Sequence, residues 1–194
     1  MPARTDLRRH PERAADTETA YAVLDEALHC HVGVVRDGAP VVLPTIHARA
    51  GDTLYLHGSP AAGILRDGRK GVEMCVTATI VDGLVLAKSA FSHSLNYRSV
   101  VVFGTARRVS DRAEKLSALK AITEHVQPGR WCASRRPTER ELQETEVLAL
   151  PIEEFSAKER FGPPVEGPLD ADLDVWSGVV PLTLVRGEPV PAYA

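Results

Sequence analysis

The sequence predicts a mainly β protein, an antiparallel barrel with inserted helices, and three observations support this class. Short β-branched runs follow one another between the turn dipeptides Asp37-Gly38, Gly51-Asp52 and Asp82-Gly83. These turns are too short for the crossovers of a parallel sheet. The chain has 194 residues, of which 44% are hydrophobic and only 5% aromatic, so its core must be mostly Val, Leu, Ala and Ile. We therefore expect about six strands in hairpin succession, closed into a barrel.

The first half of the chain is predicted to contain two helices and three strands. A charged, proline-containing arm covers 1–16, and Thr17 is a plausible N-cap for a helix over 17–28, which has apolar residues at helical spacing. Strands are expected over 31–36, 40–48 and 53–57, where Pro44 indicates an edge or a bulge. Ser59 and Pro60 suit the cap and first turn of a short helix over 60–67.

The second half is predicted to finish the barrel and then change character. The expected elements are strands over 71–81, 84–89, 99–110 and 146–157, a helix that begins at Asp111, and a short helix over 138–144. The domain organisation is thus an arm over 1–16, a barrel domain over 17–160 and an irregular tail over 161–194. Since this tail contains apolar residues such as Trp176 and Leu182, we expect it to pack on the barrel or on a partner subunit.

Composition excludes several classes of protein. The net charge of −3 argues against nucleic acid as a partner, and no apolar run is long enough to cross a membrane. The N-terminus lacks the apolar stretch of a signal peptide, and the cysteines Cys30, Cys75 and Cys132 form no CxxC pair. We therefore expect a cytoplasmic protein with reduced thiols.

Two segments carry polar groups at positions typical of a binding site. His57-Gly58-Ser59-Pro60 joins a strand to a helix, where backbone N–H groups bind anions, and Arg66 follows nearby. The alternative is a capped helix beside a solvated basic loop. The segment Ser92–Ser99, which contains His93, Tyr97 and Arg98, precedes a very apolar strand and has the composition of a ligand rim. Its alternative is a polar loop that satisfies its own backbone.

Other chemistries lack the pattern that they require. His29-Cys30-His31 does not form a metal site, because Cys30 points away from the two histidines on a strand and no fourth ligand is near. The chain has neither the G-x-S-x-G elbow of a hydrolase nor the G-x-G-x-x-G of a dinucleotide fold. We therefore expect no metal site.

Several segments together resemble the pyridoxamine 5′-phosphate oxidase-like superfamily. They are Ala22–Ala27, Cys30–Gly33, Asp52–Ser59, Asp82–Ala87 and Asn96–Gly104, which occur in the order and spacing of that superfamily. The resemblance covers about residues 8–160 and is greatest to the flavin-nucleotide-binding branch that includes nitroimidazole-resistance proteins.

This resemblance implies a six-stranded antiparallel split β-barrel that binds FMN and forms a homodimer, with two FMN sites at the subunit interface. Position by position, it implies a strand beside the isoalloxazine ring, a ribityl phosphate site and a strand entrance beside the flavin. The implied cofactor-binding residues are Val42, Leu43, Pro44 and Thr45 at the ring, His57, Gly58 and Ser59 at the phosphate, and Tyr97, Arg98 and Ser99 at the strand entrance.

Two positions depart from the pattern of the superfamily. Gly63 stands where relatives tend to carry Arg or Lys, and the loss of one such phosphate contact weakens binding by about 1.5–3 kcal/mol. Arg66 is a candidate substitute for that contact. His47 stands where an aromatic residue is often found near the flavin.

The expected function is that of an FMN-dependent oxidoreductase acting on a small molecule, with nitroreductase-like or pyridoxamine-phosphate-oxidase-like chemistry. His57, His93 and Tyr97 are the candidates for donating a proton or hydrogen bond to the substrate. The alternatives are a non-catalytic flavin or haem carrier or sensor, with His31, His57 or His93 as the iron ligand, and a dimeric scaffold that has lost its cofactor.

Overall fold

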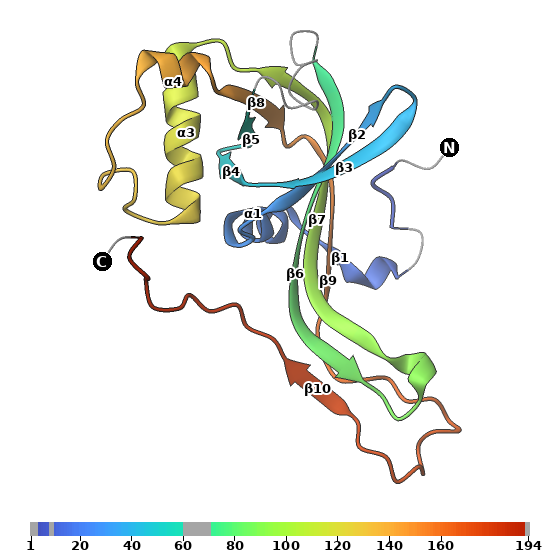
Figure 1. Cartoon of the computed structure of the whole chain (residues 1–194). Helices are drawn as coiled ribbons and strands as arrows, with labels where there is room; N and C mark the ends of the chain where they lie inside the picture. The colour runs from blue at the N-terminus through green and yellow to red at the C-terminus, as the bar shows by residue number, and fades with distance from the viewer. Residues whose placement is uncertain (1–3, 8–9, 60–70, 193–194) are drawn as a thin grey trace. The chain divides into compact units, whose positions relative to one another are not determined.

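The protein is mainly β, and its strands form one antiparallel sheet (Figure 1). The computed structural model describes residues 4–7, 10–59 and 71–192. The main path of the sheet runs β3-β2-β6-β7-β8-β5-β4, with β1, β9 and β10 paired off this path. By internal contacts the chain divides into a first unit, 1–80 with 98–159, and a second unit, 81–97 with 160–194.

The elements follow the predicted order. The helices are α1 (Thr17–Glu26), α3 (Arg112–Val126) and α4 (Glu139–Gln143). The strands are β1 (Ala14–Ala15), β2 (Cys30–Arg36), β3 (Ala39–Thr45), β4 (His47–Ala50), β5 (Thr53–Gly58), β6 (Val72–Leu86), β7 (Ser94–Arg108), β8 (Glu146–Pro151), β9 (Glu154–Arg160) and β10 (Gly178–Pro181). The predicted helix over 60–67, with Gly63 and Arg66, lies outside the described residues.

The core of the first unit is built by alternation along the strands. Cys30, Val32 and Val34 of β2 are buried, and the residues between them face the other side of the sheet. Buried side chains of β5, β6, β7 and β8 complete this aliphatic core together with Val23 and Leu24 of α1. The prediction of a core poor in aromatic residues is confirmed.

A second, smaller cluster holds α3 against the outer side of the sheet. Ala118 of α3 is buried against Val109, Val147 and Ala149, and Tyr55 and Leu119 pack against this cluster. Asp111 caps the helix by accepting a hydrogen bond from the Glu114 N–H at 2.7 Å, as expected for a helix that begins there. The helix therefore runs beside β4 and β5 (Figure 1).

The second unit corrects the prediction of a hairpin turn at Asp82-Gly83. These two residues lie inside the continuous strand β6, which pairs there with β10 in the register Pro181↔Gly83 and Val180↔Leu84. A side chain at Gly83 would lie 3.0 Å from Val179 Cγ1 and 3.1 Å from the Val180 carbonyl oxygen, so glycine permits this close approach. The tail, predicted to be irregular, thus contributes a strand.

Several element boundaries also differ from the predictions. The sheet does not close into a barrel. The expected strand over 40–48 breaks at Ile46, because His47 and Ala48 are both buried and the alternation of faces changes there. Asp16, not Thr17, caps α1, since its carboxylate accepts the Thr19 N–H at 2.8 Å. The expected strand over 146–157 is two strands, β8 and β9, and most of the polar segment before Val100 is already part of β7.

Two further findings concern the described part of the chain. Its cysteines Cys30, Cys75 and Cys132 are free thiols. None of its helices combines the length and the apolar character that a lipid bilayer crossing requires.

Candidate functional site

Three side chains converge on the C-terminal end of α1. His47, which begins β4, donates from Nε2 to the Leu24 carbonyl at 2.8 Å, and His125 of α3 donates to the Ala27 carbonyl at 2.9 Å. Arg98 of β7 binds the Glu26 carboxylate with both terminal nitrogens, at 2.5 and 3.0 Å. Since the last carbonyls of a helix have no partner within the helix, these contacts complete the end of α1 and gather β4, β7 and α3 around it.

His47 is fully buried, and burial lowers its pKa to about 4. Its ring centroid lies 5.0 Å from that of His125, and its Nδ1 atom is buried without a hydrogen-bond partner. The carbonyl partner can only accept, so Nε2 carries the hydrogen of the neutral ring. The family pattern places this position near the flavin. In this chain, however, the His47 ring is buried and hydrogen-bonded to the Leu24 carbonyl, so it is not accessible to a ligand.

Strand β3 is an edge strand. At alternate residues its backbone N–H and carbonyl groups point away from β2 and are not used in the sheet. Pro40 and Pro44 have no N–H to give to β2, so they occupy the outward-pointing positions of the ladder. Val42, midway between them, has the same orientation, and its N–H and carbonyl point away from β2. Its side chain is 61% exposed and that of Leu43 is 46% exposed. The edge thus offers apolar surface together with one backbone donor, the Val42 N–H, and three outward carbonyl acceptors, those of Pro40, Val42 and Pro44.

The register of β4 with β5 brings the predicted phosphate segment to the same end of the sheet. His47 pairs with Leu56, so His57 and Gly58, the next residues of β5, lie at the end where β3 passes into β4. Burial lowers the pKa of His57, whose Nδ1 atom is buried without a hydrogen-bond partner. The neutral imidazole therefore has an unpaired ring nitrogen at Nδ1, in the residue that precedes Gly58 and Ser59.

Part of the predicted site lies within the first unit. Val42, Leu43, Pro44 and Thr45, the end of β5, and Arg98 with Ser99 all belong to the first unit. The Arg98 guanidinium, however, is held by Glu26, so its assignment to a phosphate stays a prediction. Arg66 lies outside the described residues.

His93 and Tyr97 belong to the second unit. The Nδ1 atom of His93 accepts the Ala87 N–H at 3.0 Å, which uses the lone pair of the neutral ring and leaves Nε2 as a donor. The side chain of Tyr97 is half-buried. With this hydrogen bond, His93 is suited to donate a hydrogen bond from Nε2 and is not suited to bind iron.

The first unit also contains a groove that the sequence analysis missed. Its volume is about 560 Å³, and its walls include Val35, Val42, Met74, Cys75 and Phe103. Arg4 lies over the Phe103 ring at 4.8 Å and is paired with Glu73 and Glu154. The residues that line the groove come from five separate segments, and no sequence motif marks it.

An open antiparallel sheet, bent at Ile46 and flanked by helices, is the fold of the split barrels, and comparison with known proteins gives the family. The family model "Pyridoxamine 5′-phosphate oxidase" matches residues 16–159. The chain belongs to the pyridoxamine 5′-phosphate oxidase family, as the resemblance of its motifs implies.

Solved structures agree with this assignment. The flavocytochrome Anf3 from Azotobacter vinelandii is 36% identical, with 98% of this chain and 90% of that chain covered and a TM-score of 0.88. The FAD and haem binding protein from Mycobacterium smegmatis is 37% identical, with 93% and 89% covered and a TM-score of 0.88. A putative 5-nitroimidazole antibiotic resistance protein from Bacteroides thetaiotaomicron shares the fold at 24% identity, with 75% and 85% covered and a TM-score of 0.62. No curated protein matches the chain.

Proposed function

We propose that this protein binds a flavin at the β3 edge and uses it to transfer electrons to a small molecule. The observation that carries the proposal is the edge itself. An isoalloxazine ring has an apolar dimethylbenzene part and a pyrimidine part with both donors and acceptors. The exposed Val42 side chain suits the first part, and the outward N–H and carbonyl of Val42 suit the second.

The remainder of the flavin finds suitable groups at the end of β5. The backbone N–H groups after His57 are candidates for the phosphate, and the Ser59 hydroxyl adds a further donor. The bound flavin supplies the redox chemistry, while the chain orients the ring and excludes water from one side of it. His57 and, through Nε2, His93 are the candidate hydrogen-bond donors to the substrate.

We propose further that two copies of the chain associate. The exposed apolar side chains Val35 and Val42 lie on the same face of the β2–β3 ladder, opposite the core, and a monomer leaves them in water. A second copy would cover this surface and enclose the flavin. The FMN that the sequence analysis expects and the FAD named for the relative from Mycobacterium smegmatis share this ring, so both remain candidates.

A haem is the second candidate cofactor, because the names of both relatives above 35% identity include a cytochrome or haem. Three histidines were predicted as possible iron ligands. His93 has its lone pair in use, whereas His31 is exposed on β2 and, among the described residues, its ring contacts that of His29 at 5.4 Å. His31 therefore suits an iron ligand better than His93.

An absorption spectrum of the purified protein tests these proposals. We expect flavin bands that bleach on reduction with dithionite, in the protein as isolated or after FAD or FMN is added and the excess is removed. A Soret band that disappears in His31→Ala supports the haem, while a Soret band that remains assigns the iron to another residue. Protein that stays colourless and retains neither flavin would contradict the proposed function.

A further inference from the structure

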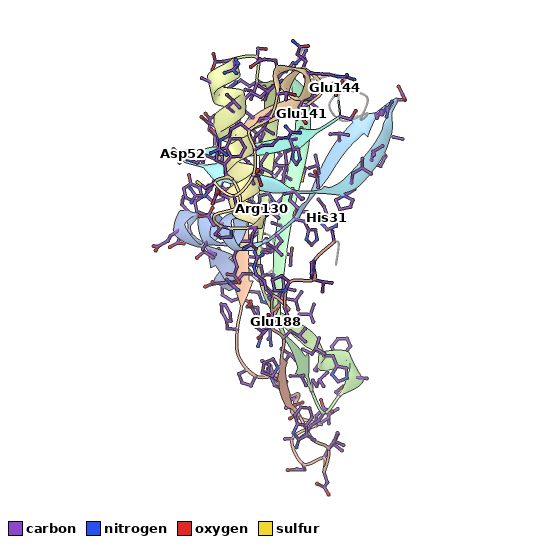
Figure 2. All side chains as sticks on the ribbon, turned by 60° about the vertical axis from the view of Figure 1, so that its left-hand side comes forward. His31, Asp52, Arg130, Glu141, Glu144 and Glu188 are labelled. Atoms are coloured by element: carbon purple, nitrogen blue, oxygen red, sulfur yellow. The ribbon has the colours of Figure 1, made fainter. Side chains whose placement is uncertain are left out.

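The loop between α3 and α4 carries an unusual concentration of positive charge. Residues 127–137, which we term the α3–α4 loop, contain Arg130, Arg135 and Arg136 and no acidic residue. Trp131, one of only two tryptophans in the chain, lies between them. Figure 2 labels Arg130 in this loop. The segment therefore combines cations with a large aromatic surface.

The backbone of the loop is held in place from α3. The two carboxylate oxygens of Glu124 accept the N–H groups of Gly129 at 2.6 Å and Trp131 at 2.8 Å. Gly129 has a positive φ of 80°, a conformation that glycine adopts without strain. Because Glu124 is occupied by the backbone, its charge does not pair with an arginine side chain of the loop.

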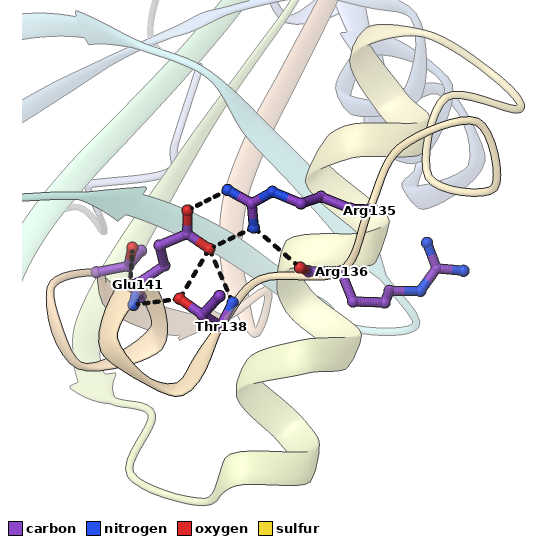
Figure 3. Close-up of polar contacts among 5 residues, drawn as sticks. Arg135, Arg136, Thr138 and Glu141 are labelled. Carbon is purple, nitrogen blue, oxygen red and sulfur yellow. Dashed lines mark hydrogen bonds and ion pairs between the residues drawn. The ribbon is translucent and has the colours of Figure 1, made fainter.

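The three arginines differ in their partners. Arg135 is paired with Glu141, which also caps α4 through Thr138, whereas the Arg136 side chain points away from this network (Figure 3). Arg136 binds the carbonyl oxygens of Trp131 and Ser134 and lies over the Trp131 ring at 4.7 Å from its centroid. Within the part of the chain that the structure describes, neither Arg130 nor Arg136 has a carboxylate partner.

This pattern differs from that of most arginines in the described residues. Arg49, Arg98, Arg107, Arg112 and Arg140 are each paired with an Asp or Glu, whereas Arg160 of β9 bonds to Asn96 and to backbone carbonyls. An uncompensated guanidinium stacked on an indole presents a flat surface with charge at its edge. Adenine rings stack on such surfaces, and phosphates accept paired hydrogen bonds from guanidinium groups.

The start of the loop is linked to the end of β3 by a short series of contacts. It begins directly after the end of α3, where His125 binds the Ala27 carbonyl and lies 5.0 Å from the ring of His47. His47 in turn follows the end of β3 by one residue, with only Ile46 between them. The loop is therefore connected to the β3 edge through two packed imidazole rings.

We propose that the α3–α4 loop binds the adenosine monophosphate part of FAD, which FMN lacks, and thereby makes the protein selective for FAD over FMN. The adenine stacks on the Trp131–Arg136 pair, and Arg130 and Arg136 bind the phosphate on the adenosine side. This inference rests on the proposed flavin site for the position of the ring, but it concerns different residues.

Comparison of FAD with FMN tests the inference. Flavin fluorescence titrations would give the dissociation constants of both for the native protein and for the double variant Arg130→Ala/Arg136→Ala. The matched control, Arg112→Ala/Arg140→Ala, removes two exposed arginines of the same region that are paired with Glu139 and Glu144. We expect the double variant to lose FAD affinity by about tenfold or more, with FMN affinity unchanged within about twofold. The control should change neither.

The other outcomes separate failure of this inference from failure of the proposed function. Unchanged FAD affinity, or an equal loss for FAD and FMN, overturns the inference. If the native protein binds neither flavin, the loop site is tested with ADP alone. ADP binding is measured by quenching of Trp131 fluorescence in the variant Trp176→Phe. ADP binding that the double variant abolishes supports the loop site with a separate adenine dinucleotide as its source. Absence of ADP binding overturns it.

Discussion

At the scale of single residues, His47 shows how burial redirects a polar side chain from ligand binding to the fold. The imidazole has no exposed surface, and its Nε2 atom completes the carbonyl end of α1. The neighbouring rings of His125 and His29 disfavour a positive charge there, and Asp25 offsets them only in part. The ring is therefore neutral in the folded protein at neutral pH.

This neutrality predicts an acid-sensitive stability. The pKa of His47 falls from 6.5 to about 4 on folding, so the unfolded chain binds more protons between these values. The contribution of His47, about 3 kcal/mol, is fully present above pH 6.5 and is lost as the pH falls towards 4. Urea unfolding between pH 7.5 and 4.5 measures this slope.

The matched variant for this measurement is His47→Gln, which keeps an N–H donor near the Leu24 carbonyl but does not titrate. We expect its stability to vary less with pH over the same interval than that of the native protein. Equal pH dependence in the two proteins would show that His47 is not the group responsible.

At the scale of elements, β3 shows how a strand can be both an edge and a binding surface. Prolines at alternate positions protect an edge against pairing with other strands, and they do so here without weakening the ladder to β2. The same alternation leaves the backbone of Val42 turned outward between them. The orientation of this one peptide group is thus set by the positions of Pro40 and Pro44.

Proline substitution separates the two roles of β3. Val42→Pro removes an outward N–H and should leave the ladder intact, while Leu43→Pro removes an N–H that faces β2 in the pair Leu43↔Val32. We expect Val42→Pro to weaken flavin binding with little loss of stability, and Leu43→Pro to cost at least about 1 kcal/mol. Flavin titration and thermal unfolding of both variants would show this. Equal destabilisation by the two prolines would refute the assigned orientation.

At the scale of the whole molecule, the second unit leaves a long apolar tail in water. After β10, the Leu182 N–H still bonds to the Asp82 carbonyl at 3.0 Å, but the described residues beyond it are all exposed. Leu184, Val185 and Val190 are 81%, 76% and 89% exposed. Such a concentration of exposed apolar side chains in one segment is typical of a segment that packs against another chain.

We therefore expect the tail to stabilise a dimer. Truncation after Leu182 keeps β10 and its pairing with β6 but removes Leu184, Val185 and Val190. Sedimentation velocity should show a dimer for the full chain and a shift towards monomer for the truncated one. The double substitution Leu184→Ser/Val185→Ser is the control for chain length and should shift the equilibrium in the same direction. A truncated chain that sediments and unfolds like the full one would show that the tail has no such role.

The class and order of the elements could be predicted from the sequence, because they depend on local patterns. Alternating apolar residues, turn dipeptides and the caps at Asp111 and Thr138 act over a few residues, and the motifs around Asp52–Ser59 and Asn96–Gly104 identify the family. The same local rules failed at Asp82-Gly83, where pairing with a strand almost a hundred residues away overrides a strong turn signal.

Which polar side chains are available to bind a ligand could not be predicted from the sequence, because this depends on the tertiary structure. Arg98 and His47 look alike in sequence as polar groups near a flavin, but Glu26 and the Leu24 carbonyl, both on α1, engage them. Arg130 and Arg136 look like ordinary loop charges, and they stand out only because most of the other arginines named above have carboxylate partners. A charged side chain is available for binding when it has no carboxylate partner within the protein. Whether it has one depends on contacts between residues that are far apart in the sequence.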